Sequence, residues 1–131
     1  MLRIALVILA LCLSGGGAVA GTRCPSGLAP MTQAELFFGL SIGAGGQVSE
    51  AAWQRFADAE ITPRFPDGLT TEDARGQWKG ASGITREGAK HLIIVLPSRD
   101  TTKLDAIRAA YKARFHQDSV LLVVSRVCGS F

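Results

Sequence analysis

Residues 62–80, TPRFPDGLTTEDARGQWKG, decide the predicted fold because this stretch ends one element and begins another. Pro63 disfavours helical geometry at Thr62, so a helix is expected to end there. The Phe-Pro-Asp-Gly sequence at 65–68 is typical of a turn, since proline fixes φ and glycine tolerates a positive φ. We expect residues 69–79 to form the strand that follows this turn.

Apolar periodicity on either side of this stretch predicts the other elements. Further strands are expected at residues 35–41, 84–96 and 119–126, and helices at 50–61 and from Thr102, as the capping residue, to Phe115. The resulting order, β-α-β-β-α-β, is that of the ferredoxin-like split arrangement. The predicted class is therefore α+β, with a four-stranded antiparallel sheet and two helices on one of its faces.

The first twenty residues have the pattern of a secretory signal peptide, with Arg3 before an apolar run and an A-x-A motif ending at Ala20. Cleavage after Ala20 would divide the chain into a signal peptide (1–20), an N-terminal tail (21–34) and a single domain (35–131). The apolar run is about half of the roughly 20 residues that span a bilayer, so a retained anchor is the less favoured alternative. A lipoprotein at Cys12 is weaker still. We expect a secreted or periplasmic protein without a stable transmembrane anchor after cleavage.

Cleavage would leave two cysteines, Cys24 and Cys128, near opposite ends of the mature chain. In an oxidising compartment this predicts a disulfide between them. The sequence contains no Cys-x-x-Cys motif, no metal-ligand spacing and no complete phosphate-binding loop, so we expect neither metal nor cofactor. The net charge of +3 is small and the charged residues are interspersed, which argues against nucleic-acid binding.

The strand pattern predicts association between copies of the chain. Leu92 and Ile94 point to one face of the third strand, whereas Ile93 and Val95 point to the other. Two helices cover only one face of a sheet, and soluble monomers rarely expose a large apolar face. We therefore expect a homodimer through the open sheet face. The alternatives are that residues 21–33 fold over that face, or that strand propensity alone explains the composition.

Polar residues in the deciding stretch are candidates for a binding site. Arg64 and Asp67 border the turn, and Asp73, Arg75 and Gln77 alternate, so they should share one face of the second strand. The planar guanidinium of Arg75 suits a carboxylate or a phosphate. One interpretation is a small pocket for an anionic or polar ligand. The other is a charge network on an edge strand, in which Asp73 and Arg75 can form an ion pair.

His91, on the third strand, is either a partly buried structural residue or a general base. No serine or cysteine lies in a recognisable nucleophile motif. The sequence therefore favours a non-catalytic module of the cell envelope that binds a small ligand or a partner. The alternative is a small enzyme of the dimeric α+β barrel type with a site on the second strand, using Asp73, Arg75 and His91. That alternative depends on fold analogy alone, and no feature of the sequence decides whether the protein is an enzyme.

Several segments together resemble a known family. They are ELFFGLS at 35–41, VSExxW at 48–53, TPRFPDGLT at 62–70, DxRGQW at 73–78 and AIRxxYKxRF at 106–115. The chain resembles a family of exported bacterial proteins known only as a domain of unknown function, DUF3574, over about residues 36–131. The resemblance implies a small secreted or envelope-anchored domain, and it supplies no catalytic residue and no cofactor.

Overall fold

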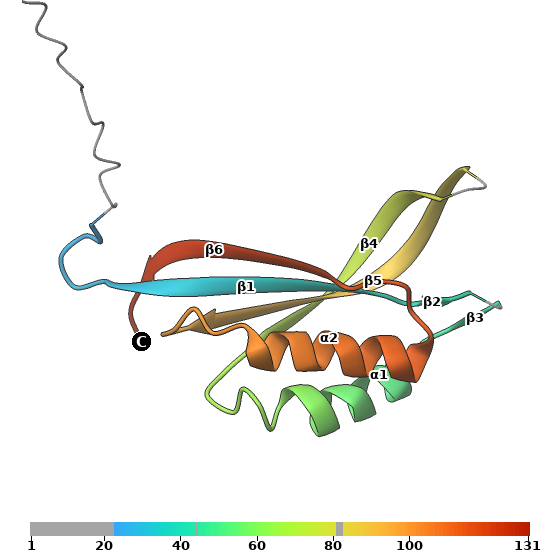
Figure 1. The fold of residues 1–131 in the computed structure, drawn as a ribbon, viewed down its shortest axis with the longest axis horizontal. Coiled ribbons are helices and arrows are strands. Elements are labelled where there is room, and N and C mark those ends of the chain that lie inside the picture. Colours follow the sequence, from blue (N-terminus) through green and yellow to red (C-terminus); the bar gives the residue numbers. More distant parts are fainter. Residues whose placement is uncertain (1–22, 44, 81–82) are drawn as a thin grey trace, which may run out of the picture.

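The computed structural model describes residues 23–43, 45–80 and 83–131, which form a sheet covered by helices on one side (Figure 1). The predicted signal peptide and its cleavage site lie outside the described residues. None of the described helices is both long and apolar enough to cross a membrane. The elements are β1 (Ala29–Gly39), β2 (Ser41–Ile42), β3 (Gly46–Gln47), α1 (Glu50–Phe56), the π-helical turn η1 (Ala57–Ile61), β4 (Thr70–Gly80), β5 (Gly83–Leu96), α2 (Thr102–Phe115) and β6 (Leu121–Gly129).

The four long strands form one antiparallel sheet in the order β4-β5-β1-β6. Figure 1 shows α1 and α2 together on one side of this sheet. Leu36 in the central strand β1 lies opposite Leu92 of β5 and Leu122 of β6, so residues far apart in the sequence meet on the helical face. The predicted α+β, ferredoxin-like arrangement is confirmed.

β1 and β6 each extend past one of their predicted boundaries, and for the same reason. β1 begins at Ala29, six residues before the predicted start at Glu35, and β6 ends at Gly129 rather than Arg126. The added residues pair with each other, from Ala29 opposite Gly129 onward. Pairing between the ends of the chain thus extends both strands beyond the apolar runs that local sequence identifies.

The helices match their predicted ranges but not all of their predicted details. The Ser49 hydroxyl accepts a hydrogen bond from the Ala52 backbone N–H at 3.2 Å, as expected of an N-cap. The prediction that Thr102 caps α2 is wrong, because Thr102 is its first residue and the Asp100 carboxylate accepts from its N–H at 2.9 Å. Hydrogen bonds from the Thr102 hydroxyl and backbone hold the pKa of Asp100 below its usual value.

An aromatic cluster fills the core between the helices and the sheet. The Tyr111 ring lies 4.7 Å from that of Phe38 and 5.1 Å from that of Phe56, measured between centroids. The Tyr111 hydroxyl donates to the Gly39 carbonyl at 2.8 Å, so this buried polar group is paired. Burial, with a smaller effect of the Glu87 charge, raises the pKa of Tyr111 well above its usual value.

The predicted disulfide between Cys24 and Cys128 is present, with Cα atoms 5.5 Å apart and a sequence separation of 104. It ties the segment before β1 to the end of β6. Closing a loop of about this length can stabilise the folded state by up to roughly 4.7 kcal/mol in the chain-entropy model. A structural disulfide is typical of proteins in oxidising compartments.

The outer half of the β4–β5 hairpin projects beyond the rest of the sheet. β4 and β5 pair along the whole hairpin to Gly80 opposite Gly83, whereas β1 pairs with β5 only from Leu96 back to Ala89. We call residues 76–80 and 83–87 the arm. Figure 1 shows this part of the hairpin twisting up and away from the body of the molecule.

Candidate functional site

The structure does not bring the predicted site residues together. Arg75 and Gln77 line one pocket, whereas Arg64 and Asp67 line another. Asp73 is held in an ion pair with Lys90, and His91 lies on the opposite face of β5. The candidate residues therefore belong to four local arrangements, which differ in what each could bind.

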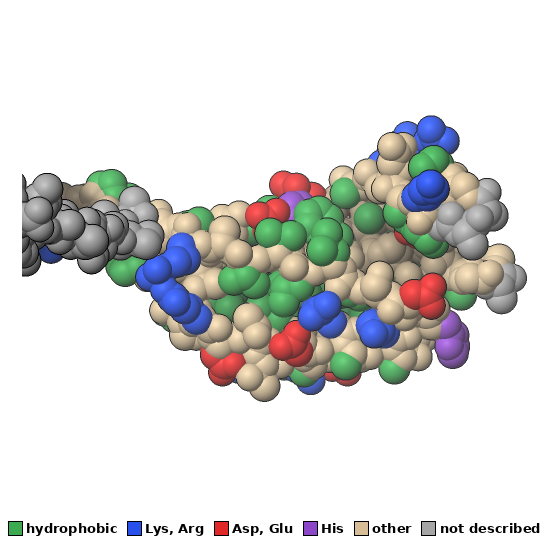
Figure 2. Space-filling model, turned by 45° about the horizontal axis from the view of Figure 1, so that its top comes forward, with side chains coloured by type: hydrophobic (Ala, Val, Ile, Leu, Met, Phe, Trp, Pro, Cys, Tyr) green, Lys and Arg blue, Asp and Glu red, His purple; other side chains and the backbone are tan. Residues whose placement is uncertain are grey.

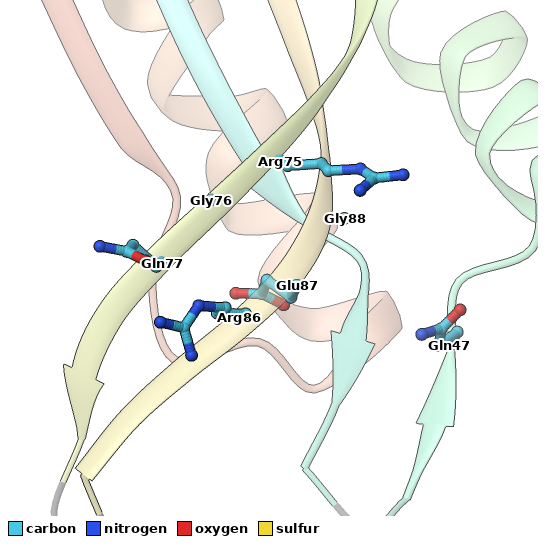
Figure 3. A pocket seen from close by; sticks show the side chains of 7 residues that line it. All are labelled: Gln47, Arg75, Gly76, Gln77, Arg86, Glu87 and Gly88. Atoms are coloured by element: carbon cyan, nitrogen blue, oxygen red, sulfur yellow. The ribbon is translucent and has the colours of Figure 1, made fainter.

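The first arrangement is a pocket of about 640 Å³ at the base of the arm, which we call the arm pocket. Gln47 of β3 closes one side, and β4 and β5 supply the rest (Figure 3). In Figure 3 the Arg75 side chain reaches across β5 on the side of β3. The lining residues are Gln47, Arg75, Gly76, Gln77, Arg86, Glu87 and Gly88.

Glu87, the carboxylate of the arm pocket, is already committed to protein contacts. One of its oxygens accepts from the Ser41 N–H at 3.0 Å and the other from the Trp78 indole N–H at 3.1 Å. A Cβ atom at Gly39 would lie 3.0 Å from both oxygens, so glycine is what allows this close approach. Glu87 therefore fixes the arm to the segment after β1.

The two guanidinium groups of the arm pocket contrast with Glu87. Among the described residues, neither Arg75 nor Arg86 has an ion pair or a side-chain hydrogen bond. Gln47 and Gln77 add neutral amide groups that both donate and accept. The pocket therefore has unused capacity to donate hydrogen bonds, which suits an anionic ligand.

Arg64 and Asp67 line a second hollow, of about 690 Å³, between the turn after η1 and the end of β5. Arg64 donates to the Glu60 carbonyl at 2.6 Å and to the Glu60 carboxylate at 2.8 Å. The first of these bonds pairs a backbone carbonyl near the end of η1 and the second is an ion pair, so Arg64 is engaged by its own helix end. Asp67 is exposed at the turn. This hollow offers less free charge than the arm pocket does.

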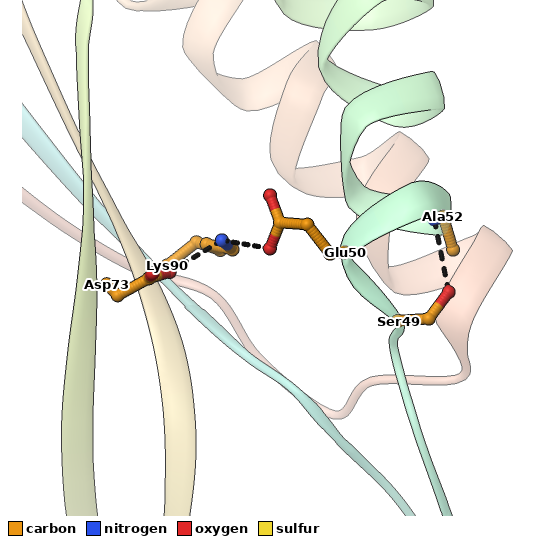
Figure 4. A network of polar contacts seen from close by, with 5 residues as sticks. All are labelled: Ser49, Glu50, Ala52, Asp73 and Lys90. Carbon is orange, nitrogen blue, oxygen red and sulfur yellow. Dashed lines mark hydrogen bonds and ion pairs between the residues drawn. The ribbon is translucent and has the colours of Figure 1, made fainter.

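Asp73 belongs to an ion network on the helical face of the sheet (Figure 4). The Lys90 ammonium lies 2.5 Å from carboxylate oxygens of both Asp73 and Glu50, and the Lys90 side chain is only 8% exposed. Desolvation acts to lower the pKa of Lys90, but hydrogen bonds and charge from Asp73 and Glu50 outweigh it and the pKa is raised. The suggested ion pair between Asp73 and Arg75 is wrong, because the Asp73 carboxylate pairs with Lys90 instead.

His91 lies on the open face of the sheet in what we call the open-face cluster: His91, Glu35, Glu72 and Phe37. The imidazole Nε2 lies 3.0 Å from the Glu35 carboxylate, and Nδ1 lies 3.4 Å from the Glu72 carboxylate. The ring stacks on Phe37, with centroids 4.4 Å apart and planes 7° from parallel. The two carboxylates therefore contact the imidazole at both of its ring nitrogens.

Sequence reasoning missed Glu35 and Glu72 as partners of His91. They come from β1 and β4, and only the strand register places them on either side of β5, with Phe37 and Glu72 directly opposite His91. Period-two alternation could have placed Glu35 and Phe37 on one face of β1. It could not have identified the neighbouring strands. Within the described residues, no group of three or more His, Cys, Asp or Glu side chains is arranged to hold a metal ion.

Residues 33–131 match the family model described as a protein of unknown function, DUF3574. The chain belongs to the DUF3574 family. This match confirms the resemblance inferred from the sequence motifs. No curated protein matches this DUF3574 chain.

Solved structures with a similar fold come from proteins that are distant in sequence. A phage SAM lyase in complex with S-methyl-5′-thioadenosine is 18% identical, with a TM-score of 0.59, covering 84% of this chain and 95% of the lyase. CutA from Synechococcus elongatus PCC7942 is 13% identical, with a TM-score of 0.53, covering 80% of this chain and 87% of CutA. At these identities the similarity establishes the fold of the DUF3574 domain and nothing of its activity.

Proposed function

We propose that this DUF3574 domain is an exported, non-catalytic module that binds a small anionic ligand in the arm pocket. The observation that carries the proposal is the pair of guanidinium groups, Arg75 and Arg86, which line one pocket without an ion-pair partner among the described residues. A planar guanidinium binds a carboxylate or a phosphate through two parallel hydrogen bonds.

The size and polarity of the pocket support a small ligand. Its volume of about 640 Å³ lies within the usual range of roughly 300–1,000 Å³ for small-molecule sites. Gln47 and Gln77 can recognise neutral polar groups next to the anionic one. Because both oxygens of Glu87 already accept hydrogen bonds, its charge opposes an incoming anion less than a free carboxylate would.

Binding is favoured over catalysis because of the residue types around this pocket. The described lining contains no serine, cysteine or histidine, and its only carboxylate is the engaged Glu87. A nucleophile and an adjacent base are the usual requirements for covalent catalysis. The arm pocket therefore has the groups to hold an anion and lacks the groups to transform it.

Export is the second part of the proposal. The signal-peptide pattern at residues 1–20 and the Cys24–Cys128 disulfide both support a secreted or periplasmic location. The ligand would then be a small anion available outside the cytoplasm.

The experiment uses the mature, oxidised chain and measures thermal unfolding with increasing inorganic phosphate, succinate or citrate. At about 100 times its dissociation constant, a ligand that binds only the folded state adds roughly 2.7 kcal/mol of stability. We expect one of these anions to raise Tm in the wild type and in Arg99→Gln, a matched control on an exposed loop. Arg75→Gln and Arg86→Gln should each lose most of the shift. Equal shifts in all four proteins, or none in any, would contradict the arm pocket as an anion site.

A second candidate function is that of a small enzyme whose acid–base group is His91. The position of His91 between Glu35 and Glu72 supports it, since such carboxylates can orient an imidazole for proton transfer. A structural neighbour with this fold is named a SAM lyase. The assay incubates the DUF3574 chain with SAM and follows release of S-methyl-5′-thioadenosine. Release that His91→Gln abolishes would favour the enzyme, and no release would leave this candidate without a substrate.

A further inference from the structure

The arm lacks the cover that the rest of the sheet receives. It consists of two strands only, and an isolated two-stranded hairpin is marginally stable in water. Both of its faces carry a large exposed apolar side chain, with Trp78 52% and Ile84 55% exposed. Lys79 and Ile84 are cross-strand partners and therefore share one face, whereas Trp78 and Thr85 share the other.

The open face of the sheet also lacks cover within the described residues. Leu121 of β6 is 59% exposed and Val123 is 42% exposed. They lie directly opposite Phe37 and Glu35 of β1, so these apolar side chains adjoin the open-face cluster. The open face thus combines apolar area with two carboxylates.

The charges of the arm and of the open face are opposite. The arm carries Lys79 and Arg86, and its one carboxylate, Glu87, is held by Ser41 and Trp78. Figure 2 shows Lys and Arg side chains gathered on the projecting arm. On the open face, Glu35 and Glu72 stand beside a single histidine. Two copies stacked face to face about an axis through this cluster would oppose like charges, whereas an arm laid on the cluster opposes unlike charges.

We propose that the open face is the docking surface for the arm of a second copy of this chain. The arm face that bears Lys79 and Ile84 packs on the open-face cluster of the neighbour, with Ile84 against Leu121 and Val123 and with Lys79 beside Glu72. The contact is heterologous, because each copy gives an arm at one place and receives one at another. It buries apolar side chains that each copy alone leaves exposed, and it gives the predicted association a defined geometry. The inference does not depend on the anion pocket.

The experiment measures the mass of the mature, oxidised chain by sedimentation equilibrium over a range of micromolar concentrations. We expect the wild type to associate. Lys79→Glu and Glu72→Lys should each weaken association by at least about tenfold, because each places like charges in contact. The double variant Lys79→Glu/Glu72→Lys should recover most of that loss, since the pair is restored with the charges exchanged.

Ile84→Ser tests the apolar part of the contact and should also weaken association, while Arg99→Glu, the same change of charge on an exposed loop, should leave it unchanged. Circular dichroism and an intact disulfide confirm that each variant is folded. A wild type that remains a monomer would overturn the proposal. An oligomer that is indifferent to Lys79→Glu and Glu72→Lys would overturn it too, as would a double variant no better than the single ones.

Discussion

Lys90 and His91 are consecutive residues on β5, each lies between two carboxylates, and they face opposite sides of the sheet. Lys90 lies under α1 and joins β4, β5 and the first turn of that helix through Asp73 and Glu50. His91 has the stacked Phe37 ring beside it, and among the described residues no helix covers its face of the sheet. A basic side chain between two carboxylates therefore stabilises the fold on the helical face and remains accessible on the open face. The two faces differ in their cover: α1 packs over Lys90, whereas no described helix packs over His91. The local residue pattern alone does not determine this cover.

Removing both pairs of carboxylates should give the largest difference between the two faces. Glu50→Gln/Asp73→Asn leaves the Lys90 ammonium without a charged partner and should lower the unfolding free energy by about 1–3 kcal/mol, less than for a fully buried charge because solvent reaches both carboxylates. The matched change Glu35→Gln/Glu72→Gln should cost less than about 1 kcal/mol. Urea unfolding with the disulfide intact measures both losses of free energy. Equal losses would show that the ion pairs on the two faces contribute equally to stability.

Alkaline pH should remove the stabilisation that the Lys90 network provides. The pKa of Lys90 in the folded state lies above its usual 10.5, so the stabilisation is complete below that pH and is lost as the pH rises through the folded-state value. The pKa of buried Tyr111 is raised as well, so Tyr111 contributes in the same direction above its usual 10.0. Urea midpoints should therefore be steady to about pH 10 and then fall.

Two variants separate the contributions to this alkaline loss. Tyr111→Phe should remove the tyrosine part, and Glu50→Gln/Asp73→Asn should remove most of the lysine part. If the midpoint falls just as steeply when both changes are combined, neither group is responsible for the loss.

Replacing His91 tests the contribution of the open face to stability. His91→Gln removes the stacking on Phe37 and the contact with Glu35, and we expect a loss of about 0.5–1.5 kcal/mol. The same variant should alter association or turnover more than it alters unfolding. A loss of several kcal/mol in urea unfolding would instead make His91 a structural residue.

The smallest effect is expected for Asp100, an exposed carboxylate just before α2. Asp100 accepts two hydrogen bonds from Thr102 and its pKa is lowered from the usual 3.8. Its contribution should be present above that pH and lost as the pH falls through the lowered value. Asp100→Ala should therefore reduce Tm at neutral pH and leave it nearly unchanged in strong acid. A difference that persists in acid would mean that Asp100 does not act through its ionised carboxylate.

The order of the elements and the disulfide could be predicted because they depend on local features. Apolar spacing, the Pro63 stop and two cysteines in a chain with a signal-peptide pattern were sufficient. The beginning of β1 could not be predicted, because Ala29 is strand only through its pairing with Gly129. Cross-strand register is a long-range property that one sequence does not reveal.

The candidate site was predicted less well than the fold, for the same reason. Arg75 and Gln77 were correctly placed on one strand, but Arg86, their partner in the arm pocket, comes from the other strand of the hairpin. Lysine usually lies at the surface, whereas Lys90 is buried and in phase with the buried Leu92. The alternation along β5 therefore indicates that Lys90 is buried, although its residue type suggests the opposite.

The most direct test of the difference between the faces measures mass and stability together on Glu35→Lys/Glu72→Lys. We predict that this variant remains a single chain at micromolar concentrations at which the wild type associates. Its unfolding free energy, measured under dilute conditions, should stay within about 1 kcal/mol of the wild type. A variant that associates as the wild type does, and that loses as much stability as Glu50→Gln/Asp73→Asn, would contradict the account.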